Sequence, residues 1–129
     1  MSKKSLKLIS ALILIIILIL FFYKNSINRV FVIDLENISY VTIQYKTQVV
    51  TLKEDKNLNE FKNDFHNIKF NYDKNALGSK GWIYNIKCYS DDSLVYNFQV
   101  ISNDTILYNG KFYITNRGNI NINYLSTLF

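Results

Sequence analysis

Residues 8–23 read LISALILIIILILFFY, and this stretch decides how the chain is organised. It contains no charge, no Pro and no Gly, and Ser10 is its only aliphatic polar residue. Its sixteen residues would rise about 24 Å as an α-helix. Leu6 and Lys7 extend this to about 27 Å, close to the ~30 Å hydrocarbon core of a bilayer. The stretch therefore predicts a transmembrane helix over residues 8–23 that contacts membrane lipid.

The residues that follow the apolar stretch favour an uncleaved signal anchor. A secretory signal peptide has a shorter apolar core and ends in small residues at its cleavage site. Here the run ends in Phe21, Phe22, Tyr23 and Lys24, and the nearest small residue is Ser26. A cleaved signal peptide is the alternative interpretation.

Lysines flank the predicted helix unequally. Lys3, Lys4 and Lys7 precede it, whereas Lys24 and Arg29 follow it. The positive-inside rule then places residues 1–7 in the cytoplasm and the chain after residue 24 outside. We expect a single-pass protein of the cell membrane with an extracytoplasmic C-terminal domain.

Composition limits what this domain can be. The chain has 129 residues, so about one hundred remain after the anchor, enough for one small domain. The net charge of +5 is carried by the five cations near the anchor, because ten basic and ten acidic residues follow from residue 30 onward. A neutral domain argues against nucleic acid as a partner. Cys88 is the only cysteine, which excludes an intramolecular disulfide.

The first half of the chain predicts a connector, a hairpin and a helix. Residues 24–37 form the connector, extended over 30–35, and residues 38–129 form the domain. Alternation predicts strands over 38–46 and 49–52, joined at Thr47-Gln48, with Tyr45 opposite Val50 and Ile43 opposite Leu52. Asp55 is a natural N-cap for a helix over 56–67. The apolar stripe of this helix is Leu58, Phe61, Phe65 and Ile68.

The second half predicts a meander of strands. Strands are expected over 69–72, 82–89, 94–102, 105–108 and 111–115, with a loop over 73–80 and a short helix over 121–128. The expected core faces carry Trp82, Tyr84, Ile86 and Cys88 on one strand and Leu94, Tyr96, Phe98 and Val100 on the next. A two-residue Asp91-Asp92 turn would break their agreement. A three- or five-residue loop that pairs Cys88 with Leu94, or a bulge, restores it.

The last two turns predict one inward row. Asn103-Asp104 and Asn109-Gly110 would pair Val100 with Leu107 and Leu107 with Phe112. The expected core therefore includes Phe61, Phe65, Trp82, Ile86, Phe98 and Phe112.

These elements predict an α+β fold: an N-terminal transmembrane helix followed by a two-layer domain, with an antiparallel β-meander and one covering helix. The layout resembles small membrane-tethered extracytoplasmic α+β domain proteins of low-GC Gram-positive bacteria, which are mostly uncharacterised. The resemblance rests on the order of the elements and on no residue motif, so it implies no site residues.

The sequence predicts no catalytic, cofactor or metal site. His66 is the only histidine and lies beside the apolar stripe of its helix, so a boundary position is favoured over an acid/base role. Alternation turns Cys88 inward, as a buried thiol. Asp91 and Asp92 lie at the opposite end of a strand from Asp104, too far apart to share a cation.

One outward-facing patch is predicted from the registers. Two-residue turns would place Ile101 opposite Ile106 and Ile106 opposite Tyr113 on the face away from the helix, with Gln99 and Tyr108 beside them. Apolar and aromatic residues on an outward face are typical of a partner-binding surface. The other interpretation is that residues 119–129 or 30–37 cover this corner.

Three functions fit these observations. The first is a non-catalytic binding, regulatory or accessory module that acts on another envelope protein or peptide. The second is a small envelope enzyme such as a hydrolase, and the third is a structural or assembly subunit.

Overall fold

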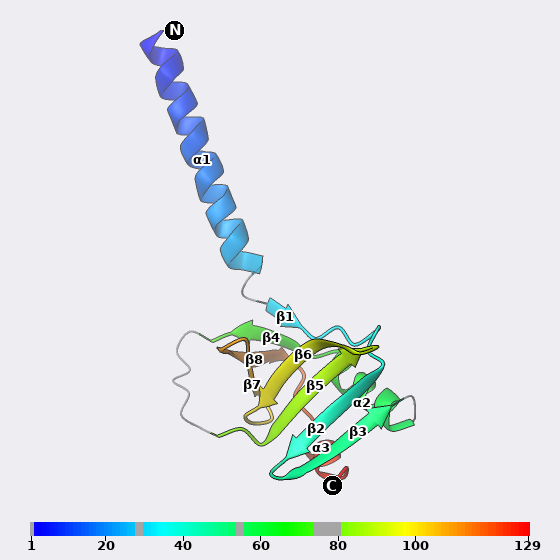
Figure 1. The fold of residues 1–129 in the computed structure, drawn as a ribbon. Helices are drawn as coiled ribbons and strands as arrows, with labels where there is room; N and C mark the ends of the chain where they lie inside the picture. The colour runs from blue at the N-terminus through cyan, green and yellow to red at the C-terminus, as the bar shows by residue number, and fades with distance from the viewer. Residues whose placement is uncertain (1, 28–29, 54–55, 74–80) are drawn as a thin grey trace. The chain divides into compact units, whose positions relative to one another are not determined.

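The computed structural model describes residues 2–27, 30–53, 56–73 and 81–129 (Figure 1). The chain divides into two compact units, residues 1–30 and residues 31–129. The first unit contains the helix α1 (Lys3–Ile27), and the second contains most of an eight-stranded sheet and two further helices. The expected α+β fold, with a long apolar helix followed by an antiparallel sheet, is confirmed. Asp55, the expected N-cap, and most of the expected loop over 73–80 lie outside the described residues.

Helix α1 is apolar around its whole circumference. Its segment Lys3–Lys24 is long and apolar enough to cross a membrane, and no part of it is buried within the protein. The hydroxyl of Ser10 donates a hydrogen bond to the carbonyl of Lys7, at 2.9 Å. The one aliphatic polar side chain of the apolar run is thus hydrogen-bonded inside the helix.

The sheet has the strand order β1-β4-β8-β7-β6-β5-β2-β3. Its strands are β1 (Val30–Val32), β2 (Tyr40–Tyr45), β3 (Gln48–Lys53), β4 (Lys69–Tyr72), β5 (Tyr84–Ser90), β6 (Ser93–Val100), β7 (Thr105–Tyr108) and β8 (Lys111–Arg117). Strands β5 to β8 form the expected meander, and every neighbouring pair from β4 to β3 is antiparallel. Figure 1 shows the helices α2 (Lys56–His66) and α3 (Ile122–Ser126) on the same side of this sheet.

The β2–β3 hairpin has the expected inward face with a different register. Tyr45 pairs with Gln48 and Ile43 with Val50, so Lys46-Thr47 form the turn. Lys46 takes a positive φ of 53°, which fits a tight hairpin turn. The expected pairing of Tyr45 with Val50 is wrong by two residues. A shift of two keeps each side chain on its face, and Val41, Ile43 and Leu52 are buried as expected.

The β5–β6 hairpin contains the bulge that the sequence allowed. Asp91-Asp92 form a two-residue turn between Ser90 and Ser93, and the register shifts between Cys88 and Tyr89. Cys88 therefore pairs with Tyr96, and Leu94 lies opposite Tyr89 and is 51% exposed. The bulge restores the agreement of the two core faces, but the expected inward position of Leu94 is wrong.

The β6–β7 connection is longer than a two-residue turn. The N–H groups of Ile101 and Ser102 both donate to the carbonyl of Thr105, and Val100 pairs with Ile106. The expected pairing of Val100 with Leu107 is wrong by one residue. Because a one-residue slip exchanges the two faces of a strand, Ile106 lies in the core and Leu107 faces away from it.

The slip carries over into β8. Asn109 and Gly110, at φ 51° and 72°, form the expected two-residue turn, so Leu107 pairs with Phe112 as predicted. Since Leu107 faces outward, Phe112 does too, and its expected place in the core is wrong. Trp82 is also outside the core, at 36% exposure, because β5 begins two residues later, at Tyr84.

The core lies between the sheet and its covering segments. Leu58, Phe61 and Phe65 of α2 are buried, and Leu125 is the buried residue of α3. Phe65 packs edge-on against Phe98 of β6, with ring centroids 5.8 Å apart. The helical stripe expected from the sequence thus contacts the expected strand.

Candidate functional site

A groove runs between α2 and the chain segment that follows β1. It has a volume of about 630 Å³. Eight residues line it: Val32, Ile33, Asp34, Leu35, Glu36, Lys62, Asn63 and His66. We call it the connector groove, with residues 32–36 as the connector wall and residues 62–66 as the helix wall.

Alternating side chains fix the connector wall to the domain. Phe31 packs in a ring of aromatic side chains and stacks on Tyr108 with ring centroids 4.6 Å apart. Ile33 and Leu35 are buried, whereas the side chains between and after them are exposed. This segment is held from inside, so its outward side chains, Asp34 and Glu36, have a defined position.

Two further hydrogen bonds hold the backbone of the connector wall. The N–H of Asp34 donates to the hydroxyl of Tyr96, at 3.2 Å. The N–H of Glu36 donates to Oδ1 of Asp34, at 3.1 Å. The second bond is an Asx turn, and it orients the Asp34 carboxylate.

The helix wall belongs to the solvent side of α2. Lys62 and Asn63 both neighbour His66 on the helix surface, because they lie four and three residues before it. Phe61 and Phe65 turn the opposite way and are buried. Lys62 is half-buried, whereas Asn63 and His66 are exposed.

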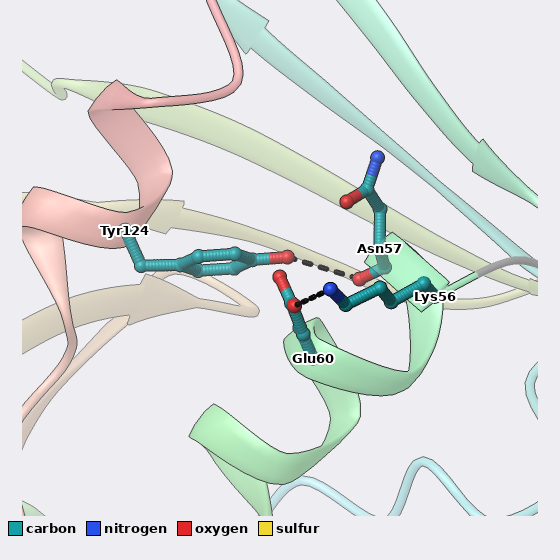
Figure 2. Close-up of polar contacts among 4 residues, drawn as sticks. All are labelled: Lys56, Asn57, Glu60 and Tyr124. Carbon is teal, nitrogen blue, oxygen red and sulfur yellow. Dashed lines mark hydrogen bonds and ion pairs between the residues drawn. The ribbon is translucent and has the colours of Figure 1, made fainter.

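Helix α2 is also tied to α3 at its N-terminal end. Figure 2 shows the hydroxyl of Tyr124 donating to the carbonyl of Asn57, at 2.9 Å. On the exposed surface of the same turn, Lys56 Nζ lies 3.9 Å from Glu60 Oε1 (Figure 2). An exposed pair of this kind adds little stability, so the tyrosine bond and the buried stripe are what position the helix.

The two walls carry opposite charges. Asp34 and Glu36 supply carboxylates on the connector wall, and Lys62 supplies a cation on the helix wall, next to the His66 imidazole. Within the described parts of the chain, Lys56–Glu60 is the one ion pair. The charges of the groove are therefore not paired with each other, and each can pair with a charge on a ligand.

The described residues offer few groups for acid/base catalysis or metal binding. Among residues 2–27, 30–53, 56–73 and 81–129, the His66 imidazole forms no hydrogen bond or ion pair, and no three His, Cys, Asp or Glu side chains are close enough to hold a metal ion. Cys88 is fully buried, and burial raises the pKa of its thiol to about 12. The thiol is thus neutral at physiological pH, which disfavours a nucleophilic role.

A second, smaller cavity lies at the turn end of β2. It has a volume of about 350 Å³ and is lined by Tyr45, Gln48, Tyr84, Ser126 and Phe129. The three rings pack on one another with centroids 5.5 to 6.1 Å apart. Burial raises the pKa of the Tyr84 phenol. These contacts describe an aromatic cluster that closes one end of the core.

The predicted outward patch is divided between the two faces of the sheet. Ile106 is 0% exposed, and Tyr108 and Tyr113 pack against the core beside Phe31. By alternation from buried Val100, Gln99 and Ile101 lie on the opposite face. The predicted joint surface of these five residues is wrong, because the β6–β7 register differs by one residue. Phe31 packs on Tyr108 and Tyr113, which lie on the core side of the sheet. Phe31 belongs to the 30–37 segment of the alternative interpretation.

The groove was missed in the sequence because its walls are far apart in the chain. Lys62 and Asn63 read as solvent-facing helix positions and His66 as a boundary residue. One signal was available: Ile33 and Leu35 alternate with Asp34 and Glu36, which marks a segment with one packed and one open side.

Comparison of the chain with protein-family models, with curated proteins and with solved structures found no match.

Proposed function

We propose that this protein is a membrane-anchored, extracytoplasmic binding module of the cell envelope, and that another envelope protein or peptide docks in its connector groove. The observation that carries the proposal is the groove itself, with a connector wall held by buried side chains and hydrogen bonds, a helix wall, and charges of both signs that are not paired with each other. Charges arranged in this way steer a partner and fix its register.

The anchor supports the membrane part of the proposal. Helix α1 has the length and the composition of a single span, and its lysines are concentrated before the apolar run. The positive-inside rule favours the orientation with the domain outside. Only residues 28 and 29 separate α1 from β1 in the sequence, and the connector wall begins at residue 32. The linker is thus short in sequence, which favours a partner in the same membrane.

The composition of the groove supports binding rather than catalysis. A hydrolase needs a nucleophile or an oriented general base. The described residues offer an exposed His66 without a hydrogen-bond partner and a Cys88 thiol sealed in the core.

Site-specific photo-crosslinking in intact cells tests the docking site. A photoreactive residue at position 63 lies in the groove, and one at position 97 lies on the exposed outer face of β6 as the matched control, since both replace exposed Asn residues. We expect a discrete crosslinked product from position 63 and none from position 97. Equal products at both positions, or none at either, would contradict docking in the groove.

A further inference from the structure

Strand β3 is an open edge of the sheet. It lies at the end of the strand order, and among the described segments only β2 pairs with it. The β2–β3 pairing is regular along the whole strand, without the register shifts found between β4 and β8 and between β5 and β6. Proteins usually protect an open edge with a bulge, a proline, a charge or a covering segment, because such an edge pairs readily with another strand. β3 has neither a bulge nor a proline.

The one charge on β3 does not guard the edge either. Lys53 is the only charged residue of the strand, and its Nζ lies 5.8 Å from the centroid of the Tyr40 ring. Tyr40 is the residue opposite Lys53 on β2. The ammonium is therefore drawn over the β2 side of the strand by a cation–π contact, and the other side is left uncharged.

The hairpin pattern identifies the free backbone groups of β3. In a two-residue hairpin, the residues that flank the turn exchange both backbone hydrogen bonds, and every second pair after them does the same. Val50 and Leu52 therefore bond to β2. The N–H and C=O groups of Val49, Thr51 and Lys53 point to the open edge, and all three residues are exposed. No other described segment forms a backbone hydrogen bond with them.

We infer that two copies of this chain pair antiparallel through β3, about a two-fold axis at Thr51. This register places Thr51 opposite Thr51 and Val49 opposite Lys53 of the second copy, so each free N–H and C=O meets a partner. No two lysines face each other. On the inner face, Val50 lies opposite Leu52 of the second copy, which joins the apolar faces of the two sheets.

The strand is complementary to itself, and this favours a second copy as the occupant of the edge. A shift of the register by two residues would leave one of Val49, Thr51 and Lys53 outside the pairing. The inference goes beyond the proposed function, because β3 contributes no residue to the connector groove. The pair would carry two connector grooves in one assembly.

Disulfide crosslinking of the full chain in phosphatidylcholine vesicles tests the pairing. Directly opposed residues in a hydrogen-bonded antiparallel pair have Cα atoms ~5.5 Å apart, which is within the range of a disulfide. Thr51→Cys should therefore form a disulfide-linked dimer on mild oxidation. The wild-type chain should run as a monomer on a non-reducing denaturing gel, because its native Cys88 is buried. Absence of the Thr51→Cys dimer would overturn the inference.

Val49→Cys is the matched control for the register. Val49 is 60% exposed on the same strand. Its two copies would be separated by four residue steps, about 14 Å at ~3.4 Å per residue, so this variant alone should not crosslink. Mixed Val49→Cys and Lys53→Cys chains should crosslink to each other, because these positions are opposed. Equal crosslinking of Val49→Cys and Thr51→Cys would reflect random collision and contradict the two-fold pairing.

Substitutions at Thr51 separate pairing from folding. Thr51→Pro removes an N–H that faces the open edge and that the hairpin does not use. Thr51→Lys places two like charges opposite each other at an exposed position. Photobleaching of singly labelled chains in vesicles should show dimers for the wild type and monomers for both variants, and circular dichroism should show the wild-type fold for Thr51→Lys. Dimers that persist in a folded Thr51→Lys chain would place the contact elsewhere and overturn the inference.

Oxidation of the Thr51→Cys chain in intact cells distinguishes a second copy from a foreign strand. We expect the dimer as the main product. A product with a different protein, and no dimer, would show that the edge takes a strand of another protein, and the inference would be wrong.

Discussion

Cys88 and Asp104 show how neighbouring atoms decide what a side chain does. Cys88 has the most nucleophilic side-chain type in the chain, yet its burial raises the pKa of the thiol and holds it neutral. Asp104 is a turn residue whose carboxylate accepts hydrogen bonds from the hydroxyls of Ser102 and Thr105, at 2.7 and 2.9 Å. These two bonds lower the pKa of Asp104.

We predict that the Cys88 thiol of the folded protein does not react with a maleimide. Burial removes both access and the thiolate, since the pKa of the thiol is about 12. Mass spectrometry after incubation near neutral pH should show unmodified protein, and the same reagent in denaturant should label it fully. Complete labelling without denaturant would place the thiol at the surface and contradict the β5 face assignment.

Asp104 should make the stability of the domain sensitive to acid. Its pKa is lower in the folded state than in the unfolded chain, where it is about 3.9. The ionised group therefore stabilises the fold above about pH 4, and this contribution is lost as the pH falls through the folded-state pKa. Thermal unfolding followed between about pH 5 and pH 2 should show a smaller loss for Asp104→Asn than for the wild type. Parallel curves for the two proteins would show that the Ser102 and Thr105 bonds do not act through the charge.

At the scale of elements, periodicity predicted where helices and strands occur, and connections decided their registers. The helix over 56–66, the strands of the meander and the terminal helix all follow from apolar spacing in the sequence. The faces of β7 and β8 did not, because the β6–β7 connection contains one residue more than a two-residue turn. No residue among Ile101–Asp104 indicates the extra loop residue. Asn109-Gly110, in contrast, is the sequence typical of a two-residue hairpin turn.

The candidate site was beyond prediction for a related reason. The sequence predicts each wall separately, one as an extended connector and the other as the polar side of a helix. Their approach depends on how Phe31 inserts among Phe70, Tyr96, Tyr108 and Tyr113, which is a tertiary contact between distant segments.

Two phenylalanines test the observed faces of the meander. Phe98 is 1% exposed and contacts Phe65, whereas Phe112 is half-buried on the outer face. Phe98→Ala should lower the free energy of unfolding by ~3–5 kcal/mol through loss of burial and a cavity. Phe112→Ala should cost about 1 kcal/mol, the typical value for a point substitution. Chemical denaturation of the full chain measures both losses. Equal losses would contradict the β6–β7 register, in which Val100 pairs with Ile106.

The whole molecule joins an apolar helix to a domain that carries the charged connector groove. Under the proposed function, the helix anchors the chain in the cell membrane and the groove opens to the outside. Asn63→Cys tests both claims at once, because this position is exposed in the groove and the native Cys88 is sealed in the core.

The most direct measurement is labelling of the Asn63→Cys chain in intact protoplasts with a maleimide that cannot cross membranes. We predict full labelling before lysis, with the labelled protein at full length in the membrane fraction. The wild-type chain, treated in the same way, should stay unlabelled. Labelling of the variant only after lysis, or recovery of a shortened product in the soluble fraction, would contradict an anchored protein whose groove faces outward.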